Sequence, residues 1–342
     1  MEKIIVYMPN WLGDVIMALP ALRQIRKNNP QSHITVLTKS IYKDIYLTED
    51  VDNIIEIVSF GNAVKEIRKL KFDQGFLFTN SFSSALIFFL GNVKNIIGYA
   101  KEGRSIFLSC HPKLSSKILS LHQSEQFLNL VNNNLEKIND DIFRVLSVNK
   151  FAQKKADDFI EKNNPGSKKI IGFGIGAKFG SAKEWLPLYY RELAHELVKN
   201  YNAVIILFGT LKETDSARYI SQGLNHNDCI NLAGKTNIAD LIAHINNCSM
   251  FIGNDSGLVH IAGALNKRTI AIFGSTSAKK TAPLGKNVKV ISSCAECAPC
   301  FKRVCSLGTM ECMKEITVEK VLDVLWHTDD VLWHTDDVLW HT

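Results

Sequence analysis

Short apolar runs alternate with segments of helical periodicity along almost the whole chain. Runs rich in Ile, Val and Phe occupy residues 3–8, 33–38, 53–58, 75–79 and 95–99 in the first half. The second half carries a comparable series at residues 169–174, 203–208, 250–253 and 269–273. Helical segments between such runs indicate parallel strands joined by helical crossovers. The alternation therefore predicts an α/β fold of two doubly wound, Rossmann-like domains.

Composition indicates where the two series separate. A polar helical region extends from residue 122 to about 162 and is followed by NNPGS, a composition typical of a linker. We therefore expect domains of residues 1–163 and 164–326. Helical periodicity in the second domain predicts helices at residues 187–200, 212–224, 238–246 and 257–265.

Length and charge exclude several classes of protein. A chain of 342 residues exceeds what one core usually supports, and 46% apolar with 22% charged residues is ordinary for globular domains. The net charge of +6 comes from scattered residues, which argues against nucleic acid as a partner. The longest nearly uncharged apolar stretch, residues 82–90, falls short of the roughly 18 residues that span a bilayer. Because the start lacks the pattern of a secretion signal, we expect a cytoplasmic protein.

The turn NWLGD, residues 10–14, follows the first expected strand. In an open α/β sheet, the turn after a strand reaches into the crevice where ligands bind. Gly13 is its only glycine, so the pattern G-x-G-x-x-G is missing and an NAD-dependent enzyme is disfavoured. From these residues alone, Asp14 is either a ligand-facing carboxylate or the N-cap of a helix beginning at Val15.

Two further strand-to-helix turns have the composition of a phosphate site. GIGAKFGSAKEW, residues 174–185, is a glycine-rich loop in which Lys178 and Lys183 offer positive charge, although it lacks the spacing of a Walker A motif. GNDSGLVH, residues 253–260, brings helix-start amides toward a ligand, and Asp255 suits a hydroxyl better than a phosphate. Solvated lysines and an ordinary capped turn are the alternatives.

Glu213 follows the expected strand at residues 203–208. An acidic side chain in this place can bind ribose hydroxyls, as in nucleotide-binding folds. Stabilisation of the first helical turn is the other interpretation.

Five of the eight cysteines lie within nineteen residues: Cys294, Cys297, Cys300, Cys305 and Cys312. Thiolates on short loops can bind zinc or an iron–sulfur cluster. The spacing matches neither a paired zinc ribbon nor a ferredoxin. We therefore expect reduced structural thiols and no metal.

The last twenty residues repeat the heptad DVLWHTD. Val, Leu and Trp are consecutive in each copy, so they spread around a helix instead of forming the seam of a coiled coil. Only the first copy continues the helical pattern before it. We interpret residues 327–342 as a duplicated tail, with an oligomerisation element as the alternative, and assign it no role.

Taken together and in this order, the segments resemble the heptosyltransferase family of GT-B glycosyltransferases, family 9, over nearly all of residues 1–326. The first half contributes MPNWLGDVIMALPALRQIRKNNPQSHITVL and FTNSFSSALIFFLGNVKNIIGY. The second contributes GAKFGSAKEWLPLYYRELA, NLAGKT and NDSGLVHIAGALNKRTIAIFGSTS. NSFSSAL and the tail CAECAPCFKRVCSLGTMECMKEIT look more like heptosyltransferase II than heptosyltransferase I. The resemblance implies two domains that face a central cleft.

This resemblance also implies a reaction. An inverting enzyme of this kind would move L-glycero-D-manno-heptose from ADP-heptose to the first heptose of the lipopolysaccharide or lipooligosaccharide inner core, carried on Kdo-lipid A. The first domain would bind this acceptor and the second the ADP-sugar, with no further cofactor. The alternatives are heptosyltransferase I, a family member with a different acceptor or sugar, and a sugar-nucleotide-binding protein without activity.

Roles for individual residues follow from the same resemblance. Asp14 matches the family's catalytic aspartate, the base that deprotonates the acceptor hydroxyl. Lys183 matches the phosphate-contacting lysine, which would stabilise the leaving diphosphate without a metal. The backbone amides expected to assist it belong to Ser256, Gly257 and Leu258.

The remaining matches concern the sugar, the ribose and the acceptor. Glu213 matches the ribose-binding acid, and Asp255 matches an aspartate near the donor sugar. Asn80, Ser81 and Arg104 are candidate contacts to the acceptor or the cleft.

An amphiphilic anionic acceptor also implies peripheral contact with the inner face of the inner membrane. The apolar residues expected to approach the lipid are Phe82, Leu86, Phe88, Phe89 and Leu90. The basic residues expected to meet acceptor phosphates are Lys101, Arg104, Lys113 and Lys117. A buried helix and scattered solvated charges are the alternative.

Overall fold

A computed structural model describes residues 1–132, 145–164 and 166–326 of the chain. The fold divides into two compact units, Met1–Ser147 and Val148–Thr342. The repeated tail, Pro165 of the expected linker and residues 133–144 of the expected polar helical region lie outside the described residues.

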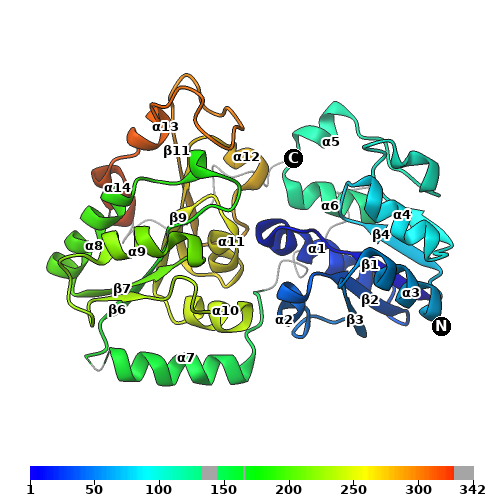
Figure 1. Cartoon of the computed structure of the whole chain (residues 1–342), viewed down its shortest axis with the longest axis horizontal. Coiled ribbons are helices and arrows are strands. Elements are labelled where there is room, and N and C mark those ends of the chain that lie inside the picture. Colours follow the sequence, from blue (N-terminus) through cyan, green and yellow to red (C-terminus); the bar gives the residue numbers. More distant parts are fainter. Residues whose placement is uncertain (133–144, 165, 327–342) are drawn as a thin grey trace. The chain divides into compact units, whose positions relative to one another are not determined.

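The first unit contains a five-stranded parallel sheet with the order β3-β2-β1-β4-β5 (Figure 1). The strand β1 is central because Val6 pairs with Val36 of β2 on one side and with Phe76 of β4 on the other. The strands are β1 (Lys3–Tyr7), β2 (His33–Thr38), β3 (Asn53–Glu56), β4 (Gln74–Leu77) and β5 (Asn95–Ile97). The helices are α1 (Leu12–Asn28), α2 (Lys43–Tyr46), α3 (Phe60–Leu70), α4 (Phe82–Leu90), α5 (Ser116–Ser120) and α6 (Gln123–Val131), with 3-10 turns η1 (Ser40–Tyr42) and η2 (Arg104–Phe107).

The second unit contains a six-stranded parallel sheet with the order β11-β10-β9-β6-β7-β8. Its strands are β6 (Lys169–Gly174), β7 (Ala203–Phe208), β8 (Cys229–Asn231), β9 (Met250–Asn254), β10 (Arg268–Phe273) and β11 (Val288–Ser292). Its helices are α7 (Lys150–Asn163), α8 (Pro187–Tyr201), α9 (Thr214–Ser221), α10 (Ile238–Asn246), α11 (Gly257–Ala264), α12 (Ala278–Thr281), α13 (Glu311–Lys314) and α14 (Val318–Trp326), with 3-10 turns η5 (Ser181–Lys183) and η6 (Leu211–Glu213). The two parallel sheets confirm the expected fold class.

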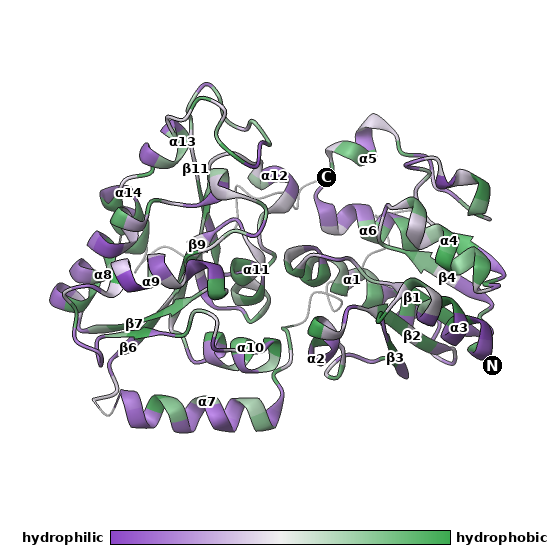
Figure 2. Cartoon of the chain, viewed as in Figure 1, coloured by the Kyte–Doolittle hydropathy of each residue, from purple (hydrophilic) through white to green (hydrophobic). Residues whose placement is uncertain are grey.

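The boundary between the units lies earlier than the expected residue 163. Helix α7 presents polar and apolar faces (Figure 2), and Ala152 and Ala156 on its buried side pack against Ala243 of α10. Lys155 adds an ion pair of 2.7 Å to Asp240. Since these contacts tie α7 to the second unit, the division falls after Ser147.

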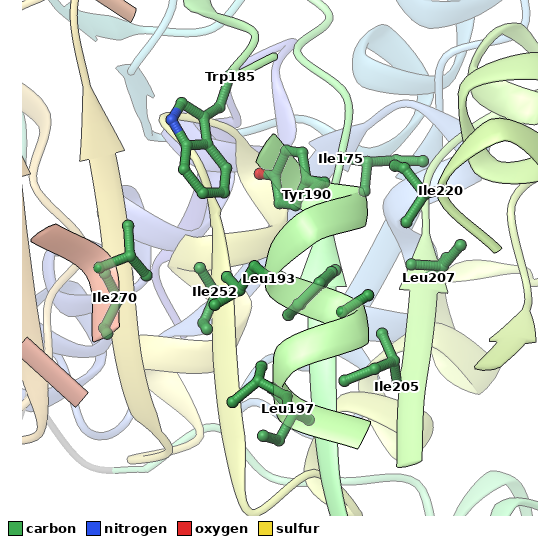
Figure 3. Packing of buried hydrophobic residues seen from close by; sticks show 14 of the residues in the cluster. Ile175, Trp185, Tyr190, Leu193, Leu197, Ile205, Leu207, Ile220, Ile252 and Ile270 are labelled. Atoms are coloured by element: carbon green, nitrogen blue, oxygen red, sulfur yellow. The ribbon is translucent and has the colours of Figure 1, made fainter. Parts of the chain in front are cut away.

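Helix α8 anchors the core of the second unit. Pro187 suits its first turn, and apolar residues recur at helical spacing along the face that meets the sheet. Leu193 and Leu197 join Ile205 of β7 and Ile252 of β9, all fully buried (Figure 3). Burial of such a side chain contributes about 1.5–3 kcal/mol, so these contacts stabilise the packing of α8 on the sheet.

A buried amide connects the core to the loops above it. Asn254, at the end of β9, is 0% exposed. Its Oδ1 accepts hydrogen bonds from the Trp185 backbone N–H at 2.8 Å and from the Tyr190 hydroxyl at 3.1 Å. Its Nδ2 donates to the Ile175 carbonyl at 3.0 Å. The loop after β6 is thereby fixed at both of its ends.

In each sheet, successive strands are added first on one side of the central strand and then on the other. The place where this order reverses is the switch point, where ligands of doubly wound folds usually bind. In the first sheet this switch point lies between β1 and β4, next to the turns that carry Asp14 and Asn80. In the second it lies between β6 and β9, next to the turns that carry Lys183 and Asp255. The topology therefore places the expected site residues next to the switch points, where ligands of such folds usually bind.

Some expected elements differ from the structure. The helix expected at residues 212–224 is divided into η6 and α9, and the strands β8 and β11 were not expected. Among the described residues, no helix has the length and apolar character required to cross a membrane.

Replacement of Asn254 by Ala should lower the free energy of unfolding of the second unit by about 2 kcal/mol or more. The Trp185 N–H and the Ile175 carbonyl would stay buried without partners, each at a cost of about 1–3 kcal/mol. Urea denaturation measures the difference. Asn200→Ala is the control, because Asn200 is exposed on α8 and its side chain donates to Glu196, one helical turn earlier, so its effect should stay within about 0.5 kcal/mol. Equal losses in both variants would contradict this role of Asn254.

Candidate functional site

The carboxyl ends of the central strands in the second unit meet at one edge of the sheet. Gly174 of β6 pairs with Gly253 of β9 and with Phe208 of β7, and Asn254 of β9 pairs with Ile272 of β10. The turns after these strands are therefore neighbours, although they are far apart in the sequence. They carry Lys183, Glu213 and Asp255, so the structure brings the expected residues of this half together.

Lys183 and Asp255 form an ion pair across the switch point. Asp255 is 5% exposed, and its Oδ2 also accepts a hydrogen bond of 2.6 Å from the Thr276 hydroxyl. Thr276 was not singled out from the sequence, although it lies in the matched segment FGSTS directly after β10. The pair fixes the position of the lysine ammonium, and Asp255 receives the partners that a buried carboxylate requires.

Helix α11 begins beside this pair without a side-chain cap. Ser256 occupies the N-cap position, but its side chain makes no capping hydrogen bond. Its Oγ is buried and has no hydrogen-bond partner among the residues that the structure describes. The first amides of a helix also lack partners within the helix. A hydroxyl, several amides and a nearby ammonium together suit a phosphate group.

Glu213 lies at the carboxyl end of β7 and is held by a capping box. Its Oε2 accepts hydrogen bonds from the backbone N–H and the hydroxyl of Thr210, each at 2.7 Å. A Cβ at Gly176 would approach the Glu213 carboxyl carbon to 2.6 Å, so the glycine leaves room for this side chain. Glu213 therefore stabilises the start of η6, as one of its two interpretations predicts. The same hydrogen bonds hold its carboxylate at the edge of the sheet.

Glu184 is a further acid that sequence reasoning passed over. Burial raises the pKa of its carboxyl, a hydrogen bond from the Ala177 backbone opposes this, and the Glu213 charge raises the pKa further. The sequence signal that could have identified Glu184 is its position directly after Lys183, in the segment KEW. Two acids therefore lie together at this edge, and one of them favours its protonated form more than an exposed glutamate does.

In the first unit, the structure excludes the N-cap interpretation of Asp14. Helix α1 begins at Leu12 with Trp11 at the cap position, so Asp14 lies within the first turn. The side chain is partly exposed, and its charge adds to burial in raising the pKa of Tyr42. The Tyr42 hydroxyl and the Lys39 ammonium both donate to the Asn10 carbonyl, at 3.4 and 3.3 Å. These contacts hold the turn that carries Asp14.

Arg104 is not a surface contact, contrary to the expectation. It is 0% exposed, and burial lowers its pKa to about 10. Its guanidinium donates to the carbonyls of Tyr99 and Thr79, at 2.8 and 2.5 Å, and to the Asn80 side-chain oxygen at 3.2 Å. The charge therefore organises the turn after β4. Ser81 caps α4 through the Ser84 N–H at 3.3 Å.

The apolar segment of α4 is divided between the core and the surface. Phe88 is fully buried, so it cannot approach a lipid surface as expected. Phe82 and Phe89 are 42% and 51% exposed, and both rings contact Phe107 of η2, with centroid distances of 5.2 and 5.0 Å. Ile106, beside Phe107, is 76% exposed. We call Phe82, Phe89, Ile106 and Phe107 the apolar patch.

All eight cysteines are free thiols. Backbone N–H groups, first those of Met310 and Leu307, lower the pKa of the Cys305 thiol, whereas burial raises that of Cys312. Within residues 1–132, 145–164 and 166–326, no group of three or more His, Cys, Asp or Glu side chains is arranged to hold a metal ion. The structural role expected for these thiols stays a prediction.

Comparison with known proteins gives matches along most of the chain. The sequence model of the family described as Glycosyltransferase family 9 (heptosyltransferase) matches residues 61–311. Lipooligosaccharide heptosyltransferase 2 of Campylobacter jejuni is 31% identical over 331 residues, covering 94% of this chain and 97% of that protein. Lipopolysaccharide heptosyltransferase 2 of Escherichia coli is 27% identical over 340 residues, with the same coverage of 94% and 97%. The structure of E. coli ADP-heptose LPS heptosyltransferase II superposes with a TM-score of 0.79 at 26% identity, covering 94% of this chain and 97% of that one.

Proposed function

Since the chain belongs to glycosyltransferase family 9, the heptosyltransferases, we propose that it transfers L-glycero-D-manno-heptose from ADP-heptose to the first heptose of the lipopolysaccharide inner core. The relatives named heptosyltransferase 2 support this choice of reaction. The observation that carries it is the Lys183–Asp255 pair beside the uncapped start of α11, at the switch point of the second sheet. This arrangement suits the diphosphate of a sugar nucleotide.

The second unit binds the donor in this proposal. The amides of Ser256, Gly257 and Leu258 receive the phosphates, with the buried Ser256 hydroxyl as a further donor. Lys183 stabilises the negative charge that develops on ADP as the bond to the sugar breaks. Asp255 holds the lysine and lies near the sugar.

Glu213 binds the ribose of the donor. Its carboxylate accepts from Thr210 and is placed by the close approach of Gly176 and Gly209 at the ends of β6 and β7. A carboxylate at this place in a nucleotide-binding fold accepts hydrogen bonds from ribose hydroxyls. Because these contacts already fix the side chain, it loses little conformational entropy when the ribose binds.

The first unit supplies the base. Asp14 takes the proton of the acceptor hydroxyl while that oxygen forms the new bond to the anomeric carbon and ADP departs with the electrons of the old bond. Attack opposite the leaving group inverts the configuration. Asn80 and Ser81 lie after β4, across the switch point from Asp14, and contact the acceptor.

Contact with a membrane is part of the proposal, because the acceptor carries lipid chains. The apolar patch supplies the surface that meets the bilayer. Lys113 and Lys117 are exposed and Lys101 partly so, which leaves these three, without Arg104, to attract anionic headgroups. The protein then works as a peripheral enzyme at the cytoplasmic face of the inner membrane.

A mass-spectrometric assay with ADP-heptose and acceptors bearing zero, one or two core heptoses tests the reaction. We expect one heptose to be added to the acceptor that already has one. Asp14→Asn should slow this transfer by about 100-fold or more, the usual scale for loss of a general base, and leave ADP binding nearly unchanged. Transfer to the heptose-free acceptor would favour heptosyltransferase I instead. ADP-heptose binding without any transfer would indicate a sugar-nucleotide-binding protein.

Lys183→Ala should weaken ADP binding and also lower kcat, because the charge interaction strengthens in the transition state. Calorimetry and initial rates measure the two effects. Lys178→Ala is the matched control, since it removes the same charge from an exposed position of the same loop. Transfer should persist in a chelator if lysine and amides stabilise the leaving group. Unchanged ADP affinity and rate in Lys183→Ala would remove this residue from the site.

Vesicle co-sedimentation tests the membrane contact. Binding to anionic vesicles should fall as salt rises, since exposed charges are screened beyond about 8 Å at physiological ionic strength. Charge reversal at Lys113 and Lys117 should weaken it further, whereas reversal at Lys199, an exposed lysine in the last turn of α8 in the second unit, serves as the control. Absence of binding at both low and high salt would refute the contact.

A further inference from the structure

We propose that Arg303 is a second cation that binds the diphosphate of the donor. It belongs to residues 294–312, which hold five cysteines and are called the cysteine-rich segment. The inference rests on the proposed function and adds a binding residue to the same site. It starts from the way in which this distant segment is attached to the loops of the switch point.

The chain after β11 is hydrogen-bonded to two of the loops that form the site. The Phe301 N–H donates to the Ser275 carbonyl at 2.7 Å, in the loop after β10 that also carries Thr276. The Arg303 carbonyl accepts from the Ala182 N–H at 3.1 Å, in the loop after β6 that carries Lys183. Residues 301–303 therefore bridge the two loops through their backbone.

Gly180 permits this attachment. A Cβ there would lie 2.2 Å from the Arg303 carbonyl oxygen, a distance that no backbone can accept, and the φ of +154° is also unusual for other residues. The Lys183 N–H donates to the Gly180 carbonyl at 3.1 Å. The backbone of Arg303 is thus fixed against the turn that presents Lys183.

Both cations lie over one aromatic ring. The Lys183 Nζ is 4.9 Å and the Arg303 Cζ is 5.5 Å from the centroid of Phe179. Such rings attract cations, and the Phe179 ring interacts with both side chains. Two like charges in this arrangement are a suitable receptor for a group that carries several negative charges.

The two cations differ in whether a carboxylate neutralises their charge. Lys183 is already paired with buried Asp255, so the pair has little net charge to offer an incoming anion. Arg303 is exposed, and no carboxylate pairs with it in the part of the chain that the structure describes. Its guanidinium suits two phosphate oxygens at once, through parallel N–H groups. Arg303 therefore supplies the net positive charge that the Lys183–Asp255 pair lacks.

Calorimetry with ADP and with adenosine, on the full chain, tests this role. Arg303→Gln should weaken ADP binding by about tenfold, the effect of one charge-assisted hydrogen bond, and leave adenosine binding unchanged. The bridge between the loops should persist, because it uses the Arg303 backbone. Lys302→Gln is the matched control, since it removes the same charge from the neighbouring residue, whose ammonium bonds to Ser306, and ADP affinity should change less than twofold.

Three results would overturn the role of Arg303. Unchanged ADP affinity in Arg303→Gln would make the guanidinium only a stacked surface cation. Equal losses in Arg303→Gln and Lys302→Gln would indicate a diffuse effect of charge. Equal losses for ADP and adenosine would indicate a structural effect on the loops. If the unaltered protein binds no ADP, the proposed function fails as well, which separates that outcome from the other three.

Discussion

The buried side chain of Asn254 fixes the geometry on which the second unit depends. A single amide accepts from the Trp185 backbone and the Tyr190 hydroxyl, and donates to the Ile175 carbonyl. It therefore joins the end of β9 to the loop after β6 and to the first turn of α8. In a low-dielectric interior these bonds are strong, and loss of the amide would leave the Trp185 N–H and the Ile175 carbonyl buried without partners, whereas the Tyr190 hydroxyl also lies 3.0 Å from the Gly174 carbonyl.

The hydrogen bonds of Asn254 also bring the Lys183–Asp255 ion pair together. Asp255 is the next residue after Asn254, and Lys183 lies two residues before Trp185, whose N–H the amide holds. The two charged residues thus approach each other because their neighbours are already joined. The ring of Trp185 packs edge to face against the ring of Tyr190 on α8 (Figure 3), so the core and the site share one set of contacts.

The sequence predicts those features that depend on local pattern. Parallel strands, their order of appearance and the turns with Asp14, Lys183 and Asp255 all follow from periodicity and from the resemblance. The edge strand β11 was missed because VKVIS is only partly buried and carries a lysine. Arg104 was placed on the surface because charge alone does not reveal that carbonyls from β4 and β5 turns satisfy it. Helix α7 and Arg303 depend on contacts between distant segments, which periodicity does not encode.

The contact between Gly180 and the Arg303 carbonyl has a consequence for the divergence of related sequences. Because no side chain fits at position 180 while the cysteine-rich segment follows its present path, the two regions cannot change independently. A lineage that loses the glycine must also reroute or shorten the segment around residue 303. An alignment of family members should therefore show joint variation between the glycine-rich loop and the cysteine-rich segment, a signature of contact that single sequences do not contain.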